Sequence, residues 1–108
     1  MRHVAPLTEP VFLILLSLSG QPRHGYALMR DIESLSNGRV RLSTGTLYGA
    51  LRRLLEDDWI ERFDQDDTSR DKQAYRLTAE GENNLRIELD RMKQLTQAAT
   101  RRMREARA

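Results

Sequence analysis

The final third of this sequence carries an apolar stripe that is too long to be buried entirely by the rest of a chain of 108 residues. Its members follow one another at steps of 4, 3, 3, 4 and 4 residues and are Leu85, Leu89, Met92, Leu95, Ala99 and Met103. This spacing places them on one face of an amphipathic helix of about 25 residues. Because so short a chain forms one small domain, we expect the distal half of this helix to pack on another chain, as a homodimer.

The N-terminal segment predicts a helix of a different kind. Thr8 is a suitable N-cap, and the following proline falls in the first turn, where proline is tolerated. The next residues are apolar almost all round, which is typical of a central helix. We expect Val11 and Leu15 to share the dimer interface with the C-terminal stripe. The unbroken apolar run ends at Leu16, far short of the ~20 residues that a membrane span needs, so no membrane association is expected.

Turn and cap residues divide the next part of the chain. A second helix should begin near His24 and close at Asn37 and Gly38, which tolerate the left-handed conformation of a helix C-cap. Residues 39–42 alternate arginine with an aliphatic residue, a pattern that predicts a very short strand. Ser43 should then cap a third helix that ends at about residue 58.

Two further strands are predicted at residues 59–63 and 73–77, joined by a polar loop of the kind that closes a hairpin. Thr78 should cap the last helix, and Glu80 and Glu82 favour the positive end of its dipole.

The predicted third helix has two contrasting faces. Its core stripe consists of Leu47, Leu51, Leu54 and Leu55. Its opposite face is small, hydroxyl-bearing and basic, and consists of Gly45, Thr46, Gly49, Arg52 and Arg53, with Tyr48 on the border. No carboxylate occurs on this helix before Glu56.

Charge is unevenly distributed, although the formal net charge is only +2. Residues 39–53 contain four arginines and no acidic residue, whereas residues 54–71 contain eight acidic and two basic residues. A basic stretch followed by an acidic one indicates a surface that binds a polyanion and has a repelling edge. On charge alone, a mixed solvated surface is the alternative.

The residue types that most enzymatic sites need are scarce. The chain has no cysteine, which excludes disulfides and thiolate metal sites and suits a reducing cytoplasm, where we expect the protein. Its two histidines are too distant in sequence to suggest a catalytic triad or a zinc site. A calcium-loop pattern that starts at Asp64 fails, because Ser69 and Tyr75 occupy the required glycine and acidic positions. We therefore expect no enzyme, no cofactor and no metal.

The order helix, helix, short strand, helix, hairpin, helix is that of a winged helix. The expected fold class is mainly α with a small β-hairpin: a winged helix-turn-helix DNA-binding domain at residues 1–78 and a long C-terminal dimerisation helix at residues 79–108. The major groove of DNA admits one α-helix, and its bases are read by side chains that project from it. Ser43 would direct the positive end of the third helix toward phosphate. Double-stranded DNA is therefore the expected partner.

Four separated motifs carry a resemblance to a known family. They are HGYAL at residues 24–28, GRVRLSTGTLYGALRRL at 38–54, WIE at 59–61 and YRLTAEG at 75–81. In this order they are similar to the PadR family of bacterial transcription regulators. The resemblance implies a homodimeric winged-helix repressor that binds a palindromic operator. Because its C-terminal part is short and holds a single helix, the chain is similar to the small subfamily.

The resemblance also implies which residues contact DNA. They are Ser43, Thr44, Thr46, Tyr48, Gly49 and Arg52 on the third helix, Tyr26 on the helix before it, and Arg70 and Lys72 on the wing. Arg53, on the basic face of the third helix, is a further expected DNA contact. The wing departs from the family pattern, because Asp64, Asp66, Asp67 and Asp71 surround its arginine. Either the acidic part points away from phosphate or the wing contributes little.

Regulation and the alternative function rest on fewer residues. Multidrug-sensing relatives stack planar ligands on a tryptophan of the C-terminal helix, but the only tryptophan here is Trp59, on a predicted wing strand. We do not carry that site over, and expect a small-molecule effector of unknown identity to act through the C-terminal helices. The alternative function is a winged-helix module that binds another protein, which the acidic residues at 56–71 favour.

Overall fold

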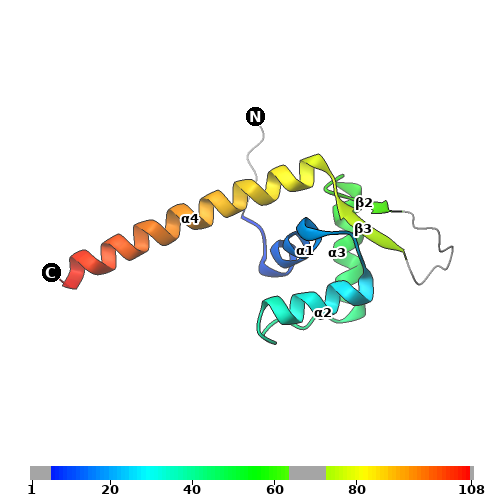
Figure 1. The fold of residues 1–108 in the computed structure, drawn as a ribbon, viewed down its shortest axis with the longest axis horizontal. Helices are drawn as coiled ribbons and strands as arrows, with labels where there is room; N and C mark the ends of the chain where they lie inside the picture. The colour runs from blue at the N-terminus through cyan, green and yellow to red at the C-terminus, as the bar shows by residue number, and fades with distance from the viewer. Residues whose placement is uncertain (1–5, 64–72, 108) are drawn as a thin grey trace.

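A computed structural model describes residues 6–63 and 73–107 of the chain. Along the sequence its elements are α1 (Glu9–Gly20), β1 (Arg23–His24), α2 (Gly25–Leu35), α3 (Thr44–Glu56), β2 (Ile60–Phe63), β3 (Ala74–Leu77) and α4 (Ala79–Arg107). The first three helices and the small sheet form one body, and α4 extends from it as a long arm that ends far from the rest of the chain (Figure 1). The predicted fold class is confirmed.

The three predicted N-caps are present. Thr8 accepts a hydrogen bond from the Val11 amide at 3.4 Å and begins α1. Ser43 accepts one from the Thr46 amide at 3.1 Å and begins α3. Thr78 accepts one from the Gly81 amide at 3.0 Å at the start of α4. Each cap satisfies an amide that the first helical turn leaves without a partner, which is why these helices begin where the sequence indicated.

The strand predicted at residues 39–42 is wrong. The alternation is real, since Val40 and Leu42 are partly buried, but no strand pairs with this segment in the part of the chain that the structure describes. The Val40 amide instead donates to Ser36 Oγ at 2.9 Å. Besides β2 and β3, the antiparallel sheet contains β1, a strand that the sequence did not indicate. The order of the strands is β1-β3-β2.

The core is centred on α1, as its uniformly apolar sequence predicted. Leu13, Ile14, Leu15 and Leu18 are buried there, and α1 contacts α2, β3 and α4. Buried side chains of the other elements join this cluster, among them Leu28, Ile32, Leu47, Leu51, Leu54, Ile60, Tyr75 and Leu85. The apolar stripe of α3 faces this cluster, and the opposite face of the helix is turned outward.

A polar cluster fixes the turn between α1 and α2. Buried Ser17 donates to Asp31 Oδ2 at 2.6 Å, and Arg23 Nε donates to the Ser17 carbonyl at 2.9 Å. The arginine also lies 3.6 Å from the Asp31 carboxylate. Because all three groups find partners, this polar cluster is tolerated close to the core.

The two halves of α4 differ in burial. Gly81, Asn84, Leu85 and Glu88 are buried against the rest of the chain, whereas every described residue from Met92 onward is exposed. Leu15 and Leu85 are almost wholly buried within the protomer, so they have no surface to offer a partner. Their assignment to a dimer interface is therefore corrected: both side chains are used in the protomer's own core.

Candidate nucleic-acid interface

The outward face of α3 is the candidate site. Leu47, Leu51 and Leu54 are buried under it. The exposed residues are Ser43, Thr44, Gly45, Thr46, Tyr48, Gly49, Arg52 and Arg53, which matches the division of faces that the sequence predicted. We call this set the α3 face.

The N-terminal end of the α3 face presents hydroxyl groups at a helix terminus. Ser43 Oγ accepts from the Thr46 amide and also lies 2.9 Å from Thr46 Oγ1, to which it donates. These two side chains thus hold each other in place. The positive end of the helix dipole lies at the same point, where an anion is stabilised.

Two glycines, one in the first turn of α3 and one near its middle, keep the α3 face flat. A Cβ built on Gly45 or Gly49 would meet no atom within 4 Å, so the space in front of both is open. Neither glycine has the positive φ that would explain its presence by backbone conformation, because only Gly38 does. Because these two glycines have no side chains, a large rigid partner can approach the helix backbone closely.

Tyr48 joins the α3 face to the start of α2. Its hydroxyl packs against Gly25, where a Cβ would lie only 2.2 Å from Tyr48 Oη. Burial raises the pKa of the neighbouring Tyr75 phenol, and the nearby Tyr48 phenol raises it further. Tyr48 itself is half-exposed: its hydroxyl end packs against Gly25, and the remainder of the side chain lies at the surface.

Tyr26 lies on α2 and is far more exposed than a core tyrosine, at 66%. The Arg30 guanidinium carbon lies 5.7 Å from its ring centroid, within the range of a cation–π contact. This pair adds a cation and a phenol to the surface of the neighbouring helix. Sequence reasoning missed Arg30, although its position one turn after Tyr26 was a signal that could have found it.

Arg52 and Arg53 supply the positive charge of the α3 face. Within residues 6–63 and 73–107, neither guanidinium forms an ion pair. The next carboxylate along the helix is Glu56, which is also exposed. Both arginine side chains are exposed at the surface of α3.

The described part of the wing carries two more cations, Arg62 and Arg76, neither of which the sequence analysis assigned to the site. Arg62 Nε donates to Gln73 Oε1 at 3.1 Å. Arg76 pairs with Glu61 at 2.7 Å and lies 4.7 Å from the Phe63 ring centroid. The cross-strand register opposes Glu61 to Arg76, and only that register reveals the pair. The wing residues Arg70 and Lys72 lie outside the described residues.

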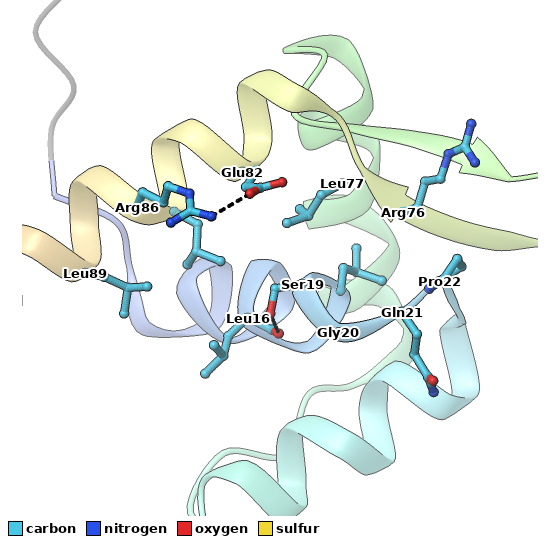
Figure 2. Close-up of a pocket in the computed structure, with 12 residues that line it drawn as sticks. Leu16, Ser19, Gly20, Gln21, Pro22, Arg76, Leu77, Glu82, Arg86 and Leu89 are labelled. Carbon is cyan, nitrogen blue, oxygen red and sulfur yellow. Dashed lines mark hydrogen bonds and ion pairs between the residues drawn. The ribbon is translucent and has the colours of Figure 1, made fainter.

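A solvent-open pocket of about 550 Å³ lies away from the α3 face, between α1, β3 and α4. Figure 2 shows Leu16, Leu77 and Leu89 among the side chains that line it, and Arg86 paired with Glu82 at its edge. Among the described residues, no group of three His, Cys, Asp or Glu side chains could hold a metal ion. No helix in those residues is long and apolar enough to cross a membrane.

Comparison with solved structures finds several regulators with this fold. A PadR family transcription regulator from Clostridium difficile R20291 superposes with a TM-score of 0.73 at 21% identity, over 89% of this chain and 99% of that one. A PadR-like transcription factor from Bacteroides fragilis gives 0.70 at 26%, over 84% and 86%. A transcriptional regulator from Clostridium thermocellum gives 0.70 at 21%, over 84% and 89%.

The sequence comparisons give the family directly. No curated protein matches the sequence significantly. The family model for the transcriptional regulator PadR-like family matches residues 14–87, which include all four motifs noted in the sequence. The family is one of transcriptional regulators, not enzymes. The match spans more than half of the sequence and agrees with the winged-helix fold, so this chain belongs to the PadR-like family of transcriptional regulators.

Proposed function

We propose that this protein is a sequence-specific DNA-binding repressor that acts as a homodimer on a palindromic operator. The observation that carries the proposal is the α3 face, which is exposed, flat at its glycines and free of carboxylates before Glu56. An α-helix of this kind fits the major groove of B-DNA.

Some residues of the α3 face would contact the DNA phosphate backbone, and others the bases. Ser43 and Thr44, at the positive end of the helix, suit phosphate, and Gly49 lets the backbone approach. Thr46 and Tyr48 can touch phosphate or a thymine methyl group, and Arg52 can reach guanine. Phosphate contacts by Tyr26, Arg53, Arg70 and Lys72 complete the proposed set.

The proposed dimer uses the exposed stripe of α4. Leu89, Met92, Leu95 and Met103 are large apolar side chains with substantial exposure, and Ala99 lies between them. Scattered exposed apolar residues need no explanation, but a continuous stripe along one helix does. We propose residues 1–78 as the DNA-binding domain and 79–108 as the dimerisation helix, with partly buried Val11 of α1 at the edge of the interface.

A two-fold symmetric dimer would place its two α3 helices in successive major grooves, about 34 Å apart. Occupation of a promoter by such a dimer represses transcription. A small-molecule effector would act by changing the relative position of the two α4 helices, because this sets the spacing of the reading helices.

The test is selection from random-sequence duplexes by the purified protein at ~150 mM salt, a condition at which non-specific binding is weak. The proposal expects enrichment of an inverted repeat, and a log–log salt slope of about -0.9 for each phosphate neutralised. No enrichment by a folded, dimeric protein would refute it. Exposed Glu56, Asp57 and Asp58 at the end of α3 favour the second candidate, a protein-binding module, which a pull-down would then identify.

A further inference from the structure

We propose that Gly81 is a positioning residue for operator recognition: it allows α4 to lie directly on the turn that ends α3, and so fixes the reading helix relative to the dimerisation helix. The inference rests on the proposed function and adds to it the element that determines operator spacing.

The contact is unusually close. Gly81 is buried in the first turns of α4, and a Cβ built on it would lie 1.9 Å from the Trp59 carbonyl oxygen and 2.8 Å from the carbonyl carbon. Real Cβ atoms essentially never contact a heavy atom of a packed neighbour at less than 3.0 Å. The obstacle is backbone, which cannot swing aside as a side chain can.

The same turn is bonded to both helices. On the α3 side, the Asp58 and Trp59 amides donate to the Leu55 and Leu54 carbonyls at 3.1 and 3.0 Å. On the α4 side, the Thr78 amide donates to the Trp59 carbonyl at 3.1 Å. Thr78 Oγ1 donates to the Asp58 carbonyl at 2.5 Å and accepts from the Gly81 amide at 3.0 Å.

We call Asp58, Trp59, Thr78 and Gly81 the α3–α4 joint. No flexible segment intervenes in it, since hydrogen bonds connect the last turn of α3 to the first turn of α4 through a single backbone turn. Asp58 adopts the left-handed conformation there, with φ 62°, which gives the turn its tight shape. A displacement of α4 at this point therefore moves the arm relative to α3.

A second anchor converts such a displacement into a tilt. Farther along α4, the Glu88 carboxylate accepts from the Leu7 amide at 3.3 Å and from Arg91 at 2.7 Å. Glu88 lies about 10 Å from Gly81 along the helix axis, at 1.5 Å per residue. Moving an added Cβ out to 3.0 Å requires a shift of about 1.1 Å, which over that length is a tilt of about 6°.

The tilt grows along the arm. Met103 lies roughly 22 Å beyond Glu88, so it moves by about 2 Å. In a symmetric dimer both protomers tilt, and the two reading helices rotate relative to each other by about 12°. That is about a third of the ~34° twist between adjacent base pairs, enough to misalign the second helix in its groove.

The experiment compares wild type, Gly81→Ala and Gly20→Ala on three duplexes: the selected inverted repeat, the same repeat with its spacing changed by one base pair, and a single half-site. Gly20→Ala is the matched control, because it is the same substitution in a helix at a site where a Cβ meets nothing within 4 Å. We expect Gly81→Ala to bind the inverted repeat at least tenfold more weakly, with less than a threefold change on the half-site. Gly20→Ala should bind as wild type.

Equal affinity of Gly81→Ala and wild type for the repeat would overturn the inference, and so would an equal loss on the half-site, which would indicate a merely structural effect. If Gly81→Ala does not fold, Thr78→Ala loosens the same joint without adding atoms. It should reduce the preference for the selected spacing at least threefold, and an unchanged preference would overturn the inference. Failure of the proposed function is distinct, because wild type itself would then prefer no duplex.

Discussion

Leu95→Asp should abolish the dimer without unfolding the protomer. Leu95 is 55% exposed on the distal half of α4, where no described residue of the same chain covers it. A new carboxylate there is solvated in the monomer and buried without a partner in the dimer. The perturbation therefore acts on association, and the core around α1 is untouched.

The magnitude follows from the exposed stripe. Leu89, Met92, Leu95 and Met103 are 41%, 40%, 55% and 63% exposed, which together amounts to about two whole side chains in each protomer. Burying them in a dimer contributes about 6–12 kcal/mol at 1.5–3 kcal/mol per fully buried side chain. Association costs about 4–15 kcal/mol, so a dimer held by this stripe has little free energy to spare.

Leu95→Asp removes two partly exposed leucines from the interface and adds two desolvated carboxylates. We expect a loss of at least about 4 kcal/mol, which raises the dimer dissociation constant about 10³-fold. Light scattering on a size-exclusion column, over a protein concentration series, measures the mass. Gln94→Asp is the control, because it places the same carboxylate on the opposite side of the helix.

Two results would refute this reasoning. One is a wild-type protein that stays monomeric throughout the concentration series. The other is a Leu95→Asp protein that keeps the dimer mass with circular dichroism unchanged, which would mean that a different surface holds the two copies together.

Four further predictions concern the α3 face, the packing of Tyr48 on Gly25, the core, and stability at acidic pH. Arg52→Ala should weaken operator binding by about 1–3 kcal/mol if it contacts guanine through two hydrogen bonds, and an unchanged titration would remove it from the site. Gly25→Ala should leave the melting temperature nearly unchanged but reduce operator affinity, because its Cβ would displace the hydroxyl end of the Tyr48 side chain; unaltered affinity would argue against a role for that ring. Ile14→Ala, at a fully buried position, should lower the free energy of unfolding by about 2–5 kcal/mol in urea titration, and a loss below 1 kcal/mol would contradict the assigned core. The Arg91 guanidinium holds the pKa of Glu88 below its ordinary value against the opposing effect of burial, with help from the Leu7 amide. The stabilising contribution of the ionised Glu88 is therefore present above the unfolded-state pKa and lost as pH falls through the lower folded-state value. In Glu88→Gln the free energy of unfolding, measured by urea titration at a series of acidic pH values, should fall less steeply with decreasing pH than in wild type. An equally steep fall would show that other carboxylates govern acid stability.

The sequence was most informative where structure is local. Thr8, Ser43 and Thr78 each bond an amide three residues away, so their role is contained in a short stretch of sequence. The amphipathic face of α3 is equally local, because a helix repeats every 3.6 residues whatever surrounds it. Residues in these positions could be assigned without knowledge of the fold.

The errors concern pairing across the chain. Arg23–His24 is a strand only because it lies beside β3, about fifty residues later, and nothing in two residues signals that pairing. Residues 39–42 have a strand-like pattern, but no strand among the described residues pairs with them. Leu15 was assigned to the dimer interface because an apolar helix does not reveal which of its faces the protomer itself covers.

Two contacts that shape the candidate site could not be predicted from the sequence. Gly81 belongs to a motif found in the sequence, but its contact with the Trp59 carbonyl depends on how α4 crosses the turn after α3. Arg76 could be seen as a wing cation, whereas its neutralisation by Glu61 depends on the strand register. Sequence patterns indicate which residues are exposed, and the tertiary structure decides which of them are already occupied.

The central claim is that two α3 faces in one dimer read a two-fold symmetric DNA site. Its most direct test is a titration at ~150 mM salt of the selected inverted repeat against a shuffled duplex of the same composition. The account predicts binding to the repeat at least ~10³-fold tighter, at two protomers per duplex. Equal affinity for the two duplexes, by a protein shown to be folded and dimeric, would contradict it.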